Sequence, residues 1–258
     1  MLTVYRLLTG LFSIFVILPI LWILYAAFIP ASAMLSADLT SLGLSLQNFA
    51  QLAGSGLAQA MLVSVGASGL AVVGQLVVGL MLAYAVRAGL PLLPVILVAL
   101  ALPTELLMVP LYRELQVLGI LDTFWALVVP YLASPLVIFL LVQSLRRLPW
   151  NLVEAARLDG ASEFVIVWRI IAPLLRPEMV AAGVLGFAIH WNLVLYPKVM
   201  TDSDSLRTVQ VLLSDILQNR PFEWGLLGAA ALATTLPLLV VYIVFERQIV
   251  EVFERSFR

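Results

Sequence analysis

The residues of this chain best suited to binding another molecule lie in one short polar stretch, Glu154 to Gly160, with the sequence EAARLDG. Glu154 and Asp159 supply carboxylates, and Arg157 supplies a guanidinium, so the stretch offers charged hydrogen bonds to a partner. It lies between two long apolar segments. A polar stretch in such a place predicts a surface that docks onto another protein.

A second set of polar and aromatic residues lies within or beside apolar segments and is a candidate substrate path. An ionisable group such as Glu105 inside a span is a functional hypothesis by default, although a structural hydrogen bond explains it equally well. Trp191 and Asn192 are suited to a sugar, because an aromatic face packs on the ring and an amide binds hydroxyls. Trp and Tyr at such positions, here Trp191 and Tyr196, more often belong to the aromatic belt at a membrane boundary.

Several kinds of chemistry are excluded by the residue inventory. The chain has no cysteine and a single histidine, His190, so it offers no thiolate ligand and no multi-histidine metal site. It has no phosphate-binding loop, no HExxH and no Gly-x-Ser-x-Gly motif. We therefore predict a protein that is not an enzyme by itself and holds no metal or cofactor of its own.

The composition requires a membrane to surround these residues. Of the 258 residues 63% are hydrophobic and 11% are charged, and the mean hydropathy is +1.09. So few charges cannot cover the surface of a water-soluble domain of this length. The net charge of −1 and the absence of a basic run give no indication of nucleic-acid binding.

The apolar segments predict an all-α membrane protein with six transmembrane helices in a single domain, residues 1–258. Each segment is near or above the roughly 20 residues that cross a bilayer. The uncharged first segment, Leu7–Ile29, exceeds the roughly 7–15 apolar residues of a cleavable signal and is expected to be retained. Prolines, among them Pro103 and Pro130, predict kinks in the third and fourth spans. The predicted spans are 8–29, 58–86, 91–112, 123–145, 178–198 and 224–246.

The orientation follows from the placement of lysine and arginine, which concentrate on the cytoplasmic side. With a cytoplasmic N-terminus, ten basic residues fall inside and four outside, so both termini and the Glu154 loop are predicted to face the cytoplasm. The inside set is Arg6, Arg87, Arg146, Arg147, Arg157, Arg169, Arg176, Arg247, Arg255 and Arg258, and the outside set is Arg113, Lys198, Arg207 and Arg220.

Local signals predict a helix–turn–helix in the cytoplasmic loop 147–177. Pro149 suits the first turn of a helix that runs to Leu158, and Gly160 suits a left-handed turn at its end. Ser162 can cap a second helix that runs from Glu163 to about residue 171. The alternative is an amphipathic hairpin that lies on the membrane surface, which the acidic residues of the loop disfavour beside anionic lipids.

The spacing Glu-Ala-Ala, three residues, Gly, nine residues and Ile resembles the signature loop of ATP-binding-cassette importer permeases. The upstream stretches 109–112 (VPLY) and 118–123 (LGILDT), together with Trp191-Asn192 and Tyr196-Pro197, resemble the second permease of the carbohydrate class, which includes maltose and glycerol-3-phosphate importers. The similarity runs from about residue 5 to 250. The chain departs from the pattern at Ala172, after Asn192, and in its C-terminal tail.

The resemblance implies a permease of the inner membrane that forms half of the translocation path of an ATP-driven importer for a sugar, oligosaccharide or glycerol-3-phosphate-like solute. It implies a second, different permease, two copies of an ATPase that hold ATP and Mg²⁺, an extracytoplasmic solute-binding protein, and surrounding lipid as partners. The loop becomes a coupling helix, with Glu154, Ala155, Ala156, Asp159 and Gly160 as the docking residues. The outer segment 199–223 either reaches toward the binding protein or lies on the membrane edge.

Two other functions were weighed against this one. A stand-alone ion-coupled carrier needs inverted repeats and buried ionisable groups, and the sequence shows no repeat and only Glu105. An intramembrane enzyme needs a catalytic constellation, which is absent. No basic residue lies deep in a span, which favours a neutral sugar over an anionic cargo.

Overall fold

The structure, a computed structural model, describes residues 2–29, 44–218 and 223–256. Within these ranges every regular element is a helix, so the predicted all-α class is confirmed. Arg220 and Arg258, which the orientation count used, lie outside the described residues. The chain divides into two compact units, residues 1–62 with 208–237 and residues 63–207 with 238–258.

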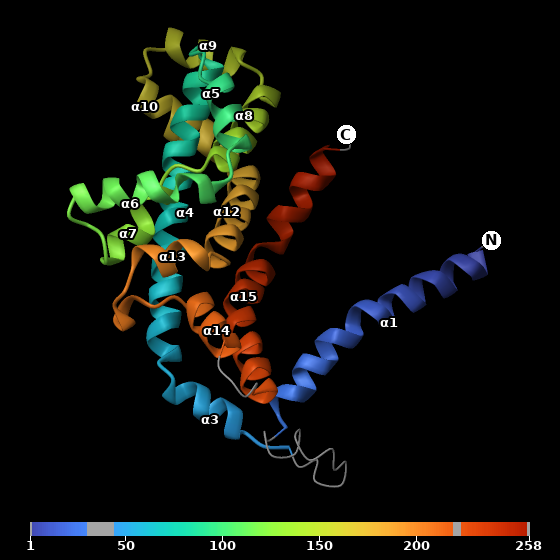
Figure 1. The fold of residues 1–258 in the computed structure, drawn as a ribbon. Helices are drawn as coiled ribbons and strands as arrows, with labels where there is room; N and C mark the ends of the chain where they lie inside the picture. The colour runs from blue at the N-terminus through green and yellow to red at the C-terminus, as the bar shows by residue number, and fades with distance from the viewer. Residues whose placement is uncertain (1, 30–43, 219–222, 257–258) are drawn as a thin grey trace. The chain divides into compact units, whose positions relative to one another are not determined.

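The elements are numbered as in Figure 1. They are α1 (Leu2–Ala27), α3 (Gln47–Gly54), α4 (Leu57–Arg87), α5 (Leu93–Ala101), η2 (Thr104–Leu107), α6 (Met108–Val117), α7 (Phe124–Val128), η3 (Val129–Tyr131), α8 (Pro135–Arg147), α9 (Asn151–Leu158), α10 (Glu163–Val165), η4 (Ile166–Ile171), α11 (Ala172–Leu174), α12 (Arg176–Trp191), α13 (Leu195–Met200), η5 (Asp204–Leu206), α14 (Val209–Gln218) and α15 (Trp224–Ser256).

Four described helical stretches are long and apolar enough to cross a membrane: Leu8–Ala27, Leu57–Arg87, Phe124–Arg147 and Trp224–Val252. Two bent helix pairs, α5 with η2–α6 and α10–α11 with α12, raise the number to six if each pair is one span. The first, second, fourth and sixth predicted spans therefore fall on these four stretches, of which Phe124–Arg147 is interrupted at residues 132–134 between η3 and α8. Their apolar side chains face outward in the isolated chain, as a lipid or protein surrounding requires.

The third predicted span, 91–112, is wrong as a single kinked helix. The helix ends at Ala101, and the following pair turns away by 96°. Leu102 and Pro103 both have extended backbone, with ψ of 123° and 131°. The residue before a proline avoids helical geometry, and Pro103 itself has no N–H to continue the ladder. The continuous helix therefore ends eleven residues before the predicted end at residue 112, next to the Pro103 that was expected to kink the span, and η2–α6 runs in a new direction.

The fifth predicted span, 178–198, is also divided. Helix α12 ends at Trp191, and α13 begins only at Leu195, so residues 192–194 separate them. At its other end α12 meets the preceding α10–α11 stretch at an angle of 83°. The break places Tyr196 on a separate short helix instead of on the span that carries Trp191.

The first unit is held together by a buried amide. The Nδ2 atom of Asn48 donates to the carbonyl oxygens of Ala27, at 2.9 Å, and Ile29, at 2.8 Å. This satisfies two carbonyls at the end of α1, where the helix has no N–H left to offer. Gly225 and Gly228 of α15 lie against the same place, and a side chain on either would collide with Asn48 or the α1 backbone.

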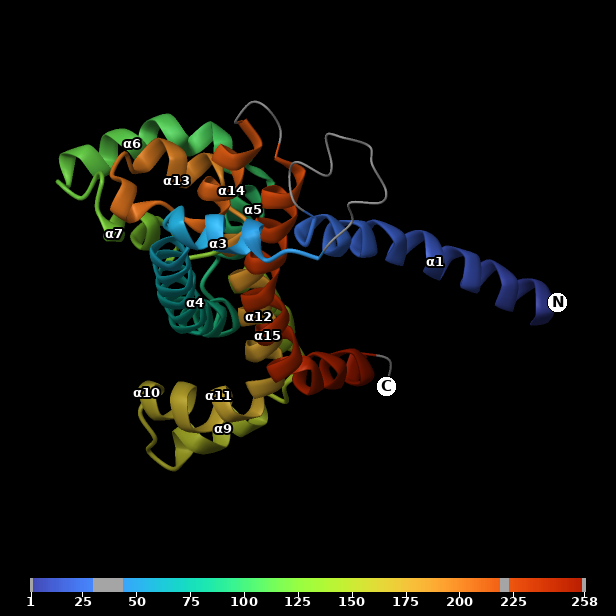
Figure 2. The same ribbon diagram turned by 90° about the horizontal axis from the view of Figure 1, so that it is seen from below.

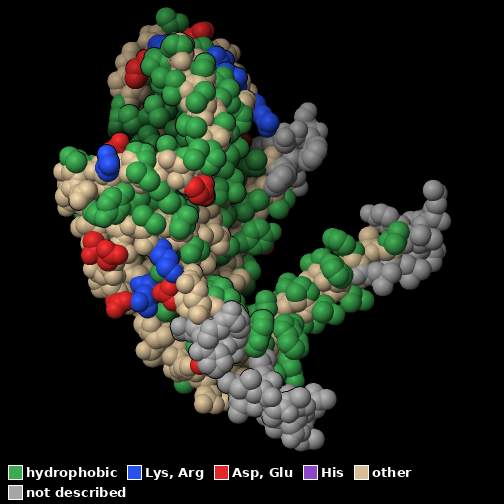
Figure 3. Space-filling model, in the orientation of Figure 1, with side chains coloured by type: hydrophobic (Ala, Val, Ile, Leu, Met, Phe, Trp, Pro, Cys, Tyr) green, Lys and Arg blue, Asp and Glu red, His purple; other side chains and the backbone are tan. Residues whose placement is uncertain are grey.

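The second unit carries the residues that the sequence singled out. Its largest hydrophobic cluster joins α4 and α8 to the loop elements α9 and η4, through residues such as Leu80, Leu141, Val153 and Ile166. Figures 1 and 2 show α9, α10 and α11 at one end of this unit, with α6, α7 and α13 toward the opposite end. On the face drawn in Figure 3, charged side chains gather at the α9–α10 end and again in the region of α13 and the segment that follows it.

Candidate docking knuckle and substrate-path residues

Residues 149–165, which we call the knuckle, form the predicted helix–glycine turn–helix. Gly160 has φ of +79°, so its left-handed conformation is confirmed. Its N–H donates to the carbonyl of Arg157 at 3.0 Å, and the N–H of Ala161 donates to the carbonyl of Ala156 at 3.0 Å. This pair of bonds is the Schellman arrangement that ends a helix and satisfies its last carbonyls.

Pro149 does not occupy the first turn, which corrects the prediction for the start of the helix. Helix α9 begins at Asn151 after Trp150, and the residue before the proline, Leu148, is extended with ψ of 139°. A proline imposes this geometry on its predecessor. Pro149 thus separates α9 from the preceding span α8, and its carbonyl accepts from the N–H of Leu152.

The second half of the knuckle begins as predicted and then departs from it. The hydroxyl of Ser162 accepts a hydrogen bond from the N–H of Val165 at 3.4 Å, which caps the helix. Residues Ile166–Ile171 form a π-helix and not the α-helix expected up to residue 171. The wider winding places Ile166, Val167 and Ile171 together in the core cluster shared with α4 and α8. Packing in three dimensions therefore overrides the local preference.

The predicted docking residues share one exposed surface, with one exception. Glu154, Ala155, Asp159 and Gly160 are exposed, whereas Ala156 is half-buried against the core cluster. Among the described residues, Glu154 and Asp159 have no ion-pair partner. The side chain of Ala156 packs against the core cluster, and its backbone carbonyl accepts from the N–H of Ala161.

Two large apolar side chains extend this surface. Leu158 is 89% exposed, and Phe164, which the sequence analysis did not single out, is 73% exposed. The ring of Phe164 lies 6.3 Å from that of Trp168. The available signal was an apolar residue two positions after the predicted cap Ser162, next to a turn rich in polar residues. These two groups make the loop a candidate contact surface.

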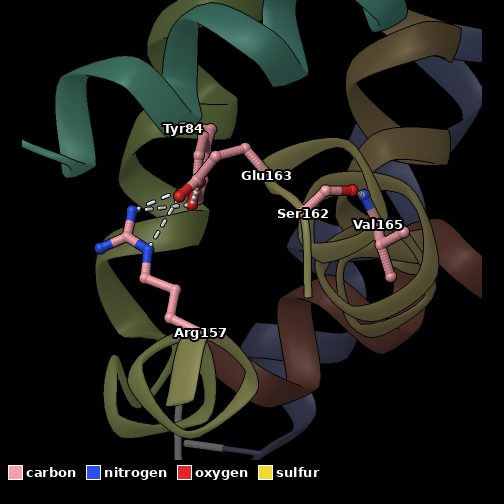
Figure 4. A network of polar contacts seen from close by, with 5 residues as sticks. All are labelled: Tyr84, Arg157, Ser162, Glu163 and Val165. Atoms are coloured by element: carbon pink, nitrogen blue, oxygen red, sulfur yellow. Dashed lines mark hydrogen bonds and ion pairs between the residues drawn. The ribbon is translucent and has the colours of Figure 1, made fainter. Parts of the chain in front are cut away.

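Arg157 is engaged within the chain. Its Nε donates to Oε1 of Glu163 at 2.9 Å, and its Nη2 donates to the hydroxyl of Tyr84 at 3.1 Å (Figure 4). The hydroxyl of Tyr84 donates to Oε2 of Glu163. The bonds from Tyr84 and then Arg157 lower the pKa of the Glu163 carboxyl, which lies in the loop outside the spans. The free charges of the knuckle are therefore acidic.

The four predicted path residues do not converge on one site in this chain. Trp191 is 3% exposed and stacks on Phe187 with ring centroids 5.5 Å apart. Tyr196 is 3% exposed, so neither ring is available to a sugar. Glu105 and Asn192 are exposed. Glu105 lies in the turn η2 after helix α5 has ended, at the bend of a helix pair that can count as one span.

Tyr196 completes the hydrogen bonding of the broken fourth span. Pro130 has no N–H for the carbonyl of Ala126, and the hydroxyl of Tyr196 donates to that oxygen at 2.8 Å. Pro135 likewise has no N–H to donate to the carbonyl of Tyr131. That carbonyl accepts instead from Nε2 of Gln75 at 3.0 Å. Carbonyls inside a membrane protein need such partners, because no bulk water is available.

His190 belongs to the same internal network. Its Nε2 lies 3.0 Å from the carbonyl oxygen of Leu127, and its Nδ1 lies 2.9 Å from the hydroxyl of Ser68. A carbonyl only accepts, so Nε2 carries the hydrogen and Nδ1 accepts from Ser68. The ring of Tyr131 meets that of His190 edge-on at 4.9 Å. His190 thus has a structural environment and joins α12 to α4 and α7.

Toward the end of the unit opposite the knuckle, Asp122 joins two loops. Its carboxylate accepts from the N–H of Asp202 at 2.9 Å, and from the N–H and hydroxyl of Ser203 at 3.0 and 2.6 Å. Its φ is +54°, a value unusual for a residue other than glycine. The bonds from Ser203 and Asp202 lower the pKa of the Asp122 carboxyl from its ordinary value. Asp122 therefore holds the loop before α7 to the loop after α13.

An all-helical membrane chain with broken spans and one rigid polar knuckle defines a helical membrane transporter component, and comparison with known proteins agrees. Residues 75–258 match the family described as binding-protein-dependent transport system inner membrane component, and the chain belongs to that family. It is therefore a membrane permease component of a transport system.

Similar proteins include the trehalose transport system permease protein SugB of Mycobacterium tuberculosis, 30% identical over 92% of this chain and 90% of that protein. The diacetylchitobiose uptake system permease protein NgcG of Streptomyces coelicolor is 32% identical over 93% of this chain and 83% of that protein. The crystal structure of a bacterial ABC transporter for the import of alginate contains a chain with the same fold, at a TM-score of 0.80, 20% identity and 95% coverage of both chains.

Proposed function

We propose that this chain is one of two different permease subunits of an ATP-driven importer for a neutral sugar or oligosaccharide, with both termini in the cytoplasm. The observation that carries the coupling role is the knuckle, whose exposed surface combines the acids Glu154 and Asp159 with the apolar Leu158 and Phe164. Such a surface fits a cleft with an apolar floor and a basic rim. The partner with that cleft is a cytoplasmic ATPase, present in two copies that hold ATP and Mg²⁺.

The sugar cargo is supported by the relatives, whose names specify trehalose and diacetylchitobiose transport. An extracytoplasmic binding protein delivers the cargo, in keeping with the description of the family. The burial of Trp191 and Tyr196 removes both aromatic rings from the candidate sugar contacts of this chain. Glu105 and Asn192 remain exposed and are the candidates for contact with the path formed together with the second permease.

The test is reconstitution of this chain with its second permease, ATPase and binding protein in proteoliposomes. Uptake and ATP hydrolysis are measured with trehalose, diacetylchitobiose, lactose and glycerol-3-phosphate. We expect ATP-dependent uptake of at least one of the sugars. Uptake of glycerol-3-phosphate alone refutes the neutral cargo, and uptake without the ATPase refutes the ATP-driven mechanism in favour of a stand-alone carrier.

The docking role is tested by reversing one knuckle charge. Glu154→Lys places a cation against the expected basic rim and should abolish binding of the ATPase in a pull-down. Glu114→Lys is the matched control, because Glu114 is an exposed acid on α6 toward the opposite end of the unit. Equal ATPase binding by wild type and Glu154→Lys would show that the knuckle surface does not dock.

A further inference from the structure

The knuckle is attached to the cytoplasmic end of α4 by hydrogen bonds, in addition to its covalent connections to the neighbouring helices. Tyr84, which is 8% exposed, lies in the last turn of α4 and bonds both Arg157 of α9 and Glu163 of α10. An ion pair as exposed as Arg157–Glu163, with side chains 41% and 57% accessible, contributes little by itself. The hydroxyl of Tyr84, a residue packed into the core cluster, gives that pair an attachment on a membrane span.

Tyr84, Arg157 and Glu163 form a hydrogen-bonded triad. A stack of cationic and aromatic groups lies beside it. The guanidinium carbon of Arg87 lies 4.7 Å from the centre of the Trp150 ring, and that of Arg157 lies 5.9 Å from it. The ring of Tyr84 is 5.8 Å from that of Trp150. Arg87 and Tyr84 come from α4, whereas Trp150 and Arg157 come from the knuckle. Cation–π contacts of this kind strengthen when they are partly desolvated.

Arg87 depends on this stack. Its Nε is buried, and within the described part of the chain it has no hydrogen-bond partner. Arg87 as a residue is half-buried, and the face of the Trp150 ring is a favourable partner for its guanidinium. Displacement of Trp150 from α4 would remove this contact. The stack therefore opposes separation of the knuckle from the span, as the triad does.

The apolar interior continues across the same boundary. Val153 of α9 and Ile166 of η4 belong to one buried cluster with Leu80 and Ala83 of α4. Packed interiors deform little and respond to force as units. The knuckle and the cytoplasmic part of α4 thus have a polar joint and an apolar joint, whereas a loop that merely connected two spans would need neither.

We propose that the triad Tyr84–Arg157–Glu163, supported by Trp150 and Arg87, is the joint that transmits displacement of the knuckle by the ATPase to α4. This inference rests on the proposed function. It makes Tyr84, Arg157 and Glu163 positioning residues for coupling, distinct from the residues that dock on the ATPase. Loss of the joint should leave docking intact and separate ATP hydrolysis from movement of the span.

The test uses the assembled complex and the double variant Tyr84→Phe/Glu163→Gln, which keeps the shape of both side chains. Hydrogen exchange is followed in peptides covering residues 80–90 and 151–165, with and without trapping by ADP and vanadate. In wild type we expect both segments to change on trapping. In the double variant we expect a change in 151–165 only, together with normal ATPase binding.

The matched control is Tyr112→Phe/Glu114→Gln, which makes the same two substitutions on α6 toward the opposite end of the unit. It should behave as wild type. As a second readout, uptake of the transported sugar per ATP hydrolysed should fall by about 2- to 30-fold in the Tyr84 variant, the range typical of residues that carry coupling. A structural role alone would reduce assembly or thermal stability and leave this ratio unchanged.

A response of residues 80–90 to trapping in the double variant, or an unchanged ratio of uptake to hydrolysis, overturns the inference while leaving the proposed function in place. Failure of the wild-type chain to bind the ATPase overturns the proposed function and this inference with it. Loss of ATPase binding in the double variant alone would assign the triad to the docking surface and also refute the transmission role.

Discussion

The turn at Gly160 allows a quantitative test of the knuckle. In Gly160→Ala a Cβ would meet no atom within 4 Å, so no steric clash arises. The whole effect comes from the backbone, because φ of +79° lies in the left-handed region. An L-residue with a side chain there costs about 1–2 kcal/mol relative to glycine. The native turn should therefore be less populated by a factor of up to about 5–30.

Gly119 provides a closely matched control. It has φ of +69°, it also has no atom within 4 Å of a built Cβ, and it follows the end of α6. Its N–H donates to the carbonyl of Gln116 at 3.1 Å, and the N–H of Ile120 donates to that of Leu115 at 3.0 Å. The two glycines thus occupy the same helix-ending motif toward opposite ends of one unit, and Gly119→Ala carries the same backbone cost.

The assay is a titration of purified ATPase against the permease pair in nanodiscs. We expect Gly160→Ala to weaken ATPase binding by up to about 5–30-fold and Gly119→Ala to leave it unchanged. The midpoint temperature of thermal unfolding should be lowered to a similar extent in the two variants. The reasoning is refuted if Gly160→Ala binds the ATPase as tightly as the wild-type chain does. It is also refuted if Gly119→Ala weakens binding as much as Gly160→Ala.

Three further predictions concern single side chains. Phe164→Ala should weaken ATPase binding by at most about 1.5–3 kcal/mol, measured by the same titration, whereas Val117→Ala, which also truncates an exposed side chain, should have no effect. Tyr196→Phe leaves the Ala126 carbonyl without its donor and should lower the free energy of unfolding by about 1–3 kcal/mol in thermal denaturation. The lowered pKa of Asp122 means that its stabilisation is complete above its ordinary pKa and is lost as the pH falls through the lower folded value. Protease cleavage within 199–206 should therefore stay constant from pH 8 to 5 and rise only in stronger acid, and Asp122→Asn should raise it at neutral pH.

Local signals in the sequence were sufficient for the knuckle. A glycine after an Ala- and Leu-rich helix and a serine before the next helix act through their own backbone and hydroxyl, so their positions could be predicted without the rest of the fold. The π-helix at 166–171 could not be predicted in this way. Its wider turn serves contacts with α4 and α8, which are distant in sequence.

The candidate path illustrates the opposite case. Trp191 and Tyr196 were singled out because aromatic rings near the end of a span suit a sugar. The same position also suits the aromatic belt at a membrane boundary, and the sequence does not separate the two. The structure places both in the core. The role of Tyr196 depends on a carbonyl that Pro130 leaves unbonded 66 residues earlier. Hydropathy records apolar surface and carries no information about such a pairing.

Because of the break in the fourth span, the residues tolerated at position 196 depend on the residue at position 130. A residue with an amide N–H in place of Pro130 would offer the Ala126 carbonyl a donor from its own segment, and that oxygen, which has two lone pairs, could still accept from Tyr196. Tyr196→Phe alone, by contrast, leaves the carbonyl unsatisfied. Lineages of this family should therefore lose the proline before the tyrosine, and a phenylalanine at 196 should be tolerated only where the proline has already been lost.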